Sequence, residues 1–205
     1  MVAGGLATVS LAQTVQFNTL SVEGLVVGHR YVLDAEFAAE NNIAVPAPFE
    51  FVAPTSDDYQ LRSLKAPGGT GIIKVFFVAD GEKVLSNLQF IPMTVTNTDM
   101  QAQLDGLQSL LEQAFNASVP DINNAALDAV RITKIGDMPA LEAIGRYEDG
   151  ENGLIVLRIV AIPNPNGVNG VIAIINAVTK NSPMQSVEDV MTIEASVALG
   201  TFAFK

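Results

Sequence analysis

The sequence predicts an α+β fold: an α/β/α sandwich with a mostly antiparallel central sheet and two main helices. Three observations support this prediction. Residues 139–178 contain three β-type runs separated by two polar, Gly-rich turns. Leucines recur at helical spacing between residues 97 and 115, and a second helical pattern follows residue 186. Strands that are interrupted by one long helix and followed by a terminal helix indicate a sheet with helices on its faces.

The strands expected before the long helix alternate apolar and polar residues. A short strand is expected around Phe49 and Phe51, and further strands over residues 59–64, 72–79 and 84–91. Residues 66–71 contain three glycines and should form a flexible connection. Asp80-Gly81 lies between two hydrophobic runs, which is typical of a tight hairpin turn.

The long helix is predicted from Leu104, Leu107, Leu111 and Phe115, which share one helical face. Asn97 or Thr98 should cap its first backbone amides, because their short polar side chains can accept hydrogen bonds there. After this helix, we expect a loop or short helix and then a strand that starts near Val130.

The predicted meander has strands around Leu141 to Tyr147, over 154–162 and over 171–178. Its turns fall at residues 148–153 and 164–170. The terminal helix should begin at Ser186, with Asp189 three residues later in an arrangement like a capping box. The final TFAF should form an extended tail.

Composition excludes several classes of function. The 205 residues carry a net charge of −11, with a pI near 4.3, which disfavours binding to nucleic acid or to an anionic membrane surface. The chain has one histidine and no cysteine, so disulfides and thiolate sites are excluded and a transition-metal site is not expected. We predict no metal, no cofactor and no membrane insertion.

The first twelve residues are uncharged and end in Ser10-Leu11-Ala12, small residues at the positions that a signal peptidase inspects. They lack a basic n-region. We therefore expect residues 1–12 to be a signal-peptide remnant or an N-terminal extension, and residues 13–205 to form a single domain. Export to the periplasm or secretion is the expected location, with a cytoplasmic location as the alternative.

Catalytic candidates are few. His29 has Ser21 and Asp34 nearby in sequence, but a catalytic triad requires a geometry that sequence proximity does not supply. A turn imidazole is the simpler interpretation of His29. The acidic residues of the 148–152 turn lack the full spacing of a calcium loop, so they are interpreted as a solvated hairpin tip, with weak cation binding as the alternative. We predict that the protein is not an enzyme.

The candidate partner-binding residues lie in the meander. Glu142, Arg146 and Arg158 are on adjacent strands and could pair across the sheet, or offer a polar binding site if that face is open. The two loop tips are the other candidates, because binding residues concentrate on loops that a rigid scaffold holds. They contribute Glu148, Asp149, Asn164 and Asn166.

The order of these segments resembles the PsbP-like α/β/α sandwich family, which includes the photosystem II extrinsic protein, the Ran-binding import factor and bacterial envelope relatives. The resemblance covers residues 46–204 and is most specific from Ala140 to Tyr147, with the hairpin, the Ser-capped helix and the closing Phe202 and Phe204 after it. It implies a scaffold for protein association without catalysis of its own.

The expected function is therefore that of a non-enzymatic accessory or binding protein in the cell envelope, acting through contacts with a protein partner of unknown identity. Two alternatives remain open from the sequence. One is an intracellular adaptor of the same fold. The other is a small-ligand binder or carboxylate-dependent hydrolase with a pocket under the Pro-rich segment near Pro46.

Overall fold

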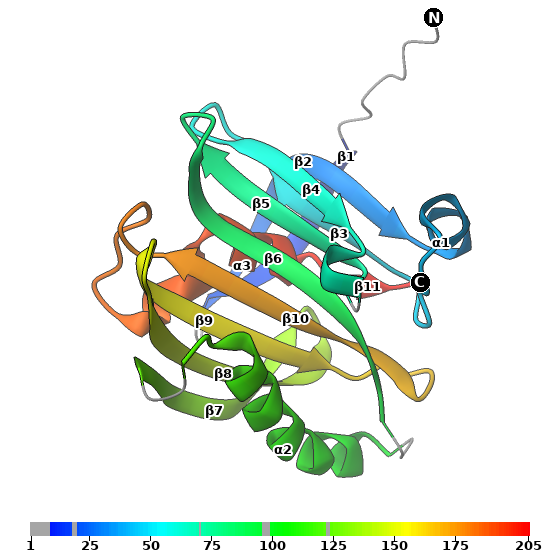
Figure 1. Ribbon diagram of the computed structural model, residues 1–205. Coiled ribbons are helices and arrows are strands. Elements are labelled where there is room, and N and C mark those ends of the chain that lie inside the picture. Colours follow the sequence, from blue (N-terminus) through cyan, green and yellow to red (C-terminus); the bar gives the residue numbers. More distant parts are fainter. Residues whose placement is uncertain (1–8, 18–19, 70, 96–98, 122–123) are drawn as a thin grey trace, which may run out of the picture.

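The computed structural model describes residues 9–17, 20–69, 71–95, 99–121 and 124–205 (Figure 1). The strands are β1 (Val9–Phe17), β2 (Leu20–Leu33), β3 (Phe49–Pro54), β4 (Gln60–Lys65), β5 (Ile73–Ala79), β6 (Lys83–Thr94), β7 (Ala125–Ile135), β8 (Met138–Asp149), β9 (Gly153–Ile162), β10 (Asn169–Val178) and β11 (Ala203–Phe204). The helices are α1 (Ala35–Asn41), α2 (Met100–Ser118) and α3 (Glu194–Gly200), with 3₁₀ turns η1 (Pro67–Gly69) and η3 (Val187–Thr192).

A seven-stranded antiparallel sheet forms the centre of the molecule, with the strand order β4-β5-β6-β10-β9-β8-β7. Helix α2 lies on one face, over β7, β8 and β9 (Figure 1). The other face packs against α3 and against a four-stranded sheet in the order β1-β2-β3-β11. The predicted α/β/α sandwich is therefore confirmed, with the addition of a second sheet in the layer of α3.

Alternation along the central strands creates two hydrophobic cores. On the α3 face, Phe49, Phe51, Phe90 and Phe202 form a packed group with ring centroids 4.8–5.6 Å apart for most pairs. On the opposite face, the leucine stripe of α2 covers Leu157 and its neighbours. Each face of the sheet thus buries its own set of alternating residues.

Gly145 of β8 allows α2 to lie close to the sheet. A Cβ atom at this position would lie 2.5 Å from the Phe115 ring of α2 and 2.5 Å from the backbone oxygen of Ala126. No real Cβ contact is this short, so a side chain here would push the helix or β7 away.

The predicted strands and the meander are confirmed. Asp80 and Gly81 both have positive φ angles, 50° and 75°, and Glu82 N donates to the Ala79 oxygen at 3.1 Å. This is the geometry of a tight hairpin turn, which the Asp-Gly pair predicts; Ala79 pairs with Lys83 across it.

Two helix boundaries differ from the prediction. The N-cap of α2 is Asp99, whose carboxylate accepts a hydrogen bond from Ala102 N at 2.9 Å, whereas Asn97 and Thr98 lie outside the described residues. Ser186 and Asp189 do cap a turn, but that turn is the 3₁₀ segment η3. Helix α3 starts only at Glu194, because Ile193 is extended (ψ 163°) and separates the two.

Two elements were not predicted as the structure has them. Strand β7 begins at Ala125, five residues before Val130, because it pairs along the whole length of β8 as far as Tyr147. The short helix α1 was missed. Asp34 caps it by accepting hydrogen bonds from the backbone of Glu36 and Phe37.

The predicted N-terminal segment lies partly outside the described residues, which exclude 1–8. Residues 9–12 belong to β1 and pair with residues 25–28 of β2. The assignment of residues 1–12 as a signal remnant or extension stays a prediction. Among the described helices, none combines the length and apolar character that a membrane span requires.

Candidate functional site

Polar side chains gather at two places on the large sheet, and these places are on opposite faces. One is an ion-pair network beneath η3 and α3. The other is a groove beside α2. Their positions follow from strand register, since side chains of directly paired residues point to the same face.

The network centres on Glu142 of β8, which is 1% exposed. Its carboxylate accepts one hydrogen bond from Arg158 Nε at 2.9 Å and one from Arg131 Nε at 2.7 Å. Arg158 of β9 is 3% exposed, and it also donates to Ser196 Oγ of α3 at 3.1 Å. Two predicted site residues, Glu142 and Arg158, thus meet in the structure, but both are buried.

Arg131 of β7 extends this network to the surface, where its Nη2 lies 3.0 Å from Glu188 Oε2 of η3. Burial lowers the pKa of Arg158, although the Glu142 carboxylate opposes the shift. Burial lowers the pKa of Arg131 as well, but its hydrogen bonds to Glu142 and Glu188 outweigh the effect of burial, so the pKa of Arg131 is raised. The network has balanced charges and joins three strands to η3 and α3.

The other predicted site residues lie apart from this network. Arg146 is half-exposed and pairs with Asp128 of β7 at 3.3 Å. Asp149 accepts hydrogen bonds from the backbone of Asn152 and Glu151, which hold its pKa below the usual range and order the turn that also contains Glu148. These two acidic residues are the last two of β8, next to the turn that leads into β9.

Asn164 and Asn166 lie beyond the opposite end of β9, where the Asn164 side chain accepts a hydrogen bond from Asn166 N at 2.9 Å. The two loop tips are therefore separated by the length of that strand. The structure does not bring the loop residues and the buried network together into one site.

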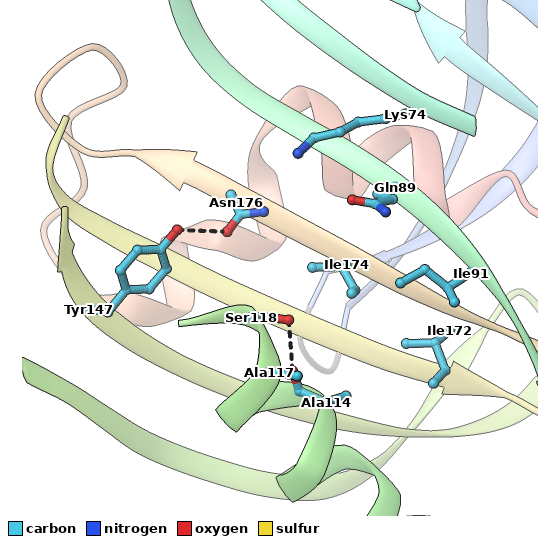
Figure 2. A pocket seen from close by; sticks show the side chains of 10 residues that line it. All are labelled: Lys74, Gln89, Ile91, Ala114, Ala117, Ser118, Tyr147, Ile172, Ile174 and Asn176. Atoms are coloured by element: carbon cyan, nitrogen blue, oxygen red, sulfur yellow. Dashed lines mark hydrogen bonds between the residues drawn. The ribbon is translucent and has the colours of Figure 1, made fainter. Parts of the chain in front are cut away.

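The groove is formed because α2 covers only part of its face of the sheet. It has a volume of about 420 Å³ and lies between the C-terminal half of α2 and strands β5, β6 and β10 (Figure 2). Lys74 and Gln89 line one side and Ala114, Ala117 and Ser118 line the other, as Figure 2 shows. Ile172 and Ile174 of β10 contribute an apolar floor.

Lys74 is the one charged residue among the described residues that line the groove. Its ammonium lies 5.2 Å from the centre of the Phe76 ring. Burial lowers its pKa, and no described carboxylate lies within salt-bridge distance of it. A partly desolvated ammonium without a counter-ion is unfavourable in a folded protein.

A chain of hydrogen bonds crosses the sheet at the end of the groove. Tyr147 OH donates to Asn176 Oδ1, and Asn176 Nδ2 donates to Asn87 Oδ1, each at 3.3 Å. Burial, with a smaller contribution from the nearby Asp149 charge, raises the pKa of Tyr147, so its hydroxyl stays protonated. Asn87 is only 7% exposed, and its Nδ2 has no hydrogen-bond acceptor in the described part of the chain.

The structure does not assemble the catalytic candidates. His29 is exposed on β2 and packs edge-on against Tyr31, with ring centroids 4.5 Å apart. Asp34 is engaged as the cap of α1, and the Ser21 side chain is outside the described part. In the described residues, no group of three or more acidic, histidine or cysteine side chains is placed to hold a metal ion.

Sequence reasoning missed the groove, although a signal was present. Lys74 and Asn176 each interrupt an otherwise apolar β-type run, and Gln89 lies between Leu88 and Phe90. A polar residue at such a position either finds a partner inside the fold or faces an opening, and the sequence cannot distinguish these outcomes.

Comparison with known proteins places the fold. No protein-family description matches the chain, and no curated protein does. Among solved structures, the chain is similar to cyanobacterial PsbP (CyanoP) from Synechocystis sp. PCC 6803, with 13% identity, 99% of each chain covered and a TM-score of 0.53. The chain therefore has the PsbP-like fold that its sequence resembles, and at this identity the similarity shows the fold alone.

Two further similarities are weaker. The Ran-binding protein Mog1p of Saccharomyces cerevisiae is 8% identical, with 71% of this chain and 95% of that chain covered and a TM-score of 0.37. A protein of unknown function from Pseudomonas aeruginosa is 14% identical, with 76% and 88% covered and a TM-score of 0.35. At these TM-scores neither similarity carries an argument.

Proposed function

We propose that this protein is a non-enzymatic accessory protein that binds a protein partner on the part of the large sheet that α2 leaves uncovered. The proposal rests on one observation: this surface combines exposed apolar side chains with cations that lack carboxylate partners. It consists of the α2-side face of β4, β5, β6 and β10. We call it the open face. Such a surface, apolar and polar at once, is typical of interfaces between separately folded proteins.

Register identifies the side chains of the open face. Arg62 is paired with Phe76, and Leu64 with Lys74, so all four point to the same side. Leu64 is 55% exposed, so the open face presents a large apolar side chain next to Lys74. Arg62 and Lys74 are the charged residues of β4, β5 and β6 on this side, and neither has a carboxylate partner in the described residues.

Charge complementarity indicates the chemistry of the partner. The chain as a whole has a net charge of −11, so most of its surface repels acidic proteins. The open face is a local exception because it presents two cations that lack carboxylate partners in the described residues, next to apolar side chains; Arg62 donates to the backbone oxygen of Gly81. We therefore propose a partner with an acidic surface that contributes its own apolar side chains.

The test is site-specific cross-linking. Benzoylphenylalanine replaces Leu64 on the open face or, as a matched control, Leu154, which is 37% exposed on the opposite side of the sheet. The proposal expects one protein to be cross-linked at position 64 only, with competition by unlabelled chain, and to bind the purified protein in solution. Equal cross-linking at both positions, or none at 64, would overturn it.

We also propose that residues 13–205 act as one domain in the cell envelope, as a periplasmic or secreted protein. The support is the uncharged segment that ends in Ser10-Leu11-Ala12. Cell fractionation followed by N-terminal mass analysis of the native protein tests this location. A cytoplasmic protein that retains residues 1–12 would contradict it and favour the intracellular adaptor.

A further inference from the structure

The groove contains a positive charge that the fold does not balance. Lys74 is held partly out of water by Phe76 and by neighbouring strands, and burial lowers its pKa. The opposite face shows that this sheet can pair buried cations, because Arg158 has a carboxylate at 2.9 Å. The Lys74 ammonium can therefore donate a hydrogen bond to an anion that enters the groove.

Amide side chains surround this cation. Gln89 is directly paired with Lys74. Two residues earlier on the same strand, Asn87 is paired with Asn176. Gln89 lines the groove beside Lys74, so an anion bound there would meet both an ammonium and a side-chain amide donor.

We propose that the groove binds the carboxylate of an acidic side chain, in an extended segment of the partner protein, with Lys74 as its counter-ion. This inference rests on the proposed function, since it assigns the chemistry of the partner at the centre of the open face. Gln89 supplies an amide donor to the carboxylate. Ile91, Ile172 and Ile174 contact the methylene groups of the acidic side chain.

The charges around the groove limit the ligand to a single negative charge. Lys74 is the one cation among the described residues that line the groove. Helix α2 ends at the groove with Ser118, so the negative end of its dipole opposes any second negative charge on the ligand. Asp149 lies close enough to Tyr147 to raise its pKa, which makes the far end of the groove unfavourable for anions. A phosphate group, with about two charges, normally requires several arginines or a helix N-terminus.

The test uses two short peptides as probes, acetyl-Leu-Glu-Leu-amide and acetyl-Leu-Gln-Leu-amide, titrated into the isotope-labelled full chain and followed by NMR. The glutamate peptide should shift the signals of Lys74, Gln89 and Asn176 and bind about tenfold more tightly than the glutamine peptide, because it adds a charge-assisted hydrogen bond. Lys74→Met should remove this preference. Lys134→Met, an exposed lysine on β7, should keep it.

The outcomes separate this inference from the proposed function. Equal affinities for the two peptides, or a preference that persists in Lys74→Met, would overturn the carboxylate site. If the cross-linked partner binds Lys74→Met as tightly as the unmodified chain, the open face still binds protein but the inference fails. The unchanged NMR spectrum of Lys74→Met away from the groove verifies that this variant is folded.

Discussion

Arg158 and Lys74 are two cations of the same sheet, on opposite faces and with opposite surroundings. Arg158 is almost completely buried, and it has Glu142 at 2.9 Å and Ser196 at 3.1 Å. Lys74 is partly buried and has an aromatic ring but no carboxylate in the described structure. The face of Arg158 is covered by η3, α3 and the second sheet, whereas α2 leaves the position of Lys74 open.

This difference separates a structural use of charge from a binding use. A buried ion pair is stabilising only if its partners satisfy each other, and the network around Glu142 meets this condition. An unpaired cation at the edge of a groove contributes nothing comparable to the fold. The four predictions below test the comparison, beginning with the largest expected effect.

The largest effect is expected for Glu142→Gln. This substitution leaves Arg158 buried without a counter-charge, which should lower the free energy of unfolding by about 3–5 kcal/mol. Urea unfolding measures the loss. Glu188→Gln is the matched control, since its carboxylate is 40% exposed and should matter by about 1 kcal/mol or less. Equal losses in both variants would show that burial does not distinguish the two carboxylates.

The second prediction concerns α2, which covers one part of its face of the large sheet and leaves the other part open. In Gly145→Ala, the new methyl group would meet Phe115 and the Ala126 backbone at 2.5 Å, so we expect a loss of about 1–3 kcal/mol. Gly150→Ala is the control, because a Cβ atom there would have nothing within 4 Å. Thermal unfolding of both variants tests this prediction. A stable Gly145→Ala variant would mean that α2 does not contact the sheet as described.

The fold was largely predictable where one side of a strand faces a core. In β5, the buried Ile73, Val75 and Phe77 alternate with the half-buried Lys74 and Phe76, and such patterns indicate strands irrespective of what covers them. The start of β7 was harder to predict from the sequence, because Ala125 and Ala126 have weak strand preference and are held by pairing with β8. Tertiary pairing decided that boundary.

The candidate site was only partly predictable. The expected pairing of Glu142 with Arg158 is present, but Arg146 pairs instead with Asp128, which the bulge in β7 places nearby. The groove combines Lys74, Gln89 and Asn176 from three strands with the end of α2. Which face α2 covers, and how far it extends, depends on packing over more than a hundred residues, and no local pattern encodes it.

The third prediction is a gain in stability. Lys74→Met replaces a partly desolvated ammonium with a group that can keep the contact with Phe76. We expect the free energy of unfolding to rise by roughly 0.5 kcal/mol, a small value because water still reaches the groove. The control Lys134→Met should change it by less. A loss of stability in Lys74→Met would indicate a structural role for this lysine.

The smallest effect is a dependence on acidity at η3. Hydrogen bonds from the backbone of Gln185 and Ser186 hold the pKa of Asp189 below its ordinary value of 3.8. Because the folded pKa is lowered, this contribution is complete above the unfolded value and is lost as pH falls through the folded value. The urea midpoints of wild type and Asp189→Asn should differ at neutral pH and converge as the pH falls through the lowered pKa of Asp189. A constant difference would contradict this assignment.

The contact between Thr201 and β3 has a consequence for the time course of folding. Val52 N donates to Thr201 Oγ1 at 2.7 Å, and the two residues are 149 positions apart in the sequence. Phe202 completes the aromatic group around Phe49. During synthesis, β3 can therefore complete its contacts only after the 149 residues that lead to Thr201 have been made. Pairings of such long range are slow to form, so we expect refolding to be limited by the arrival of this C-terminal segment.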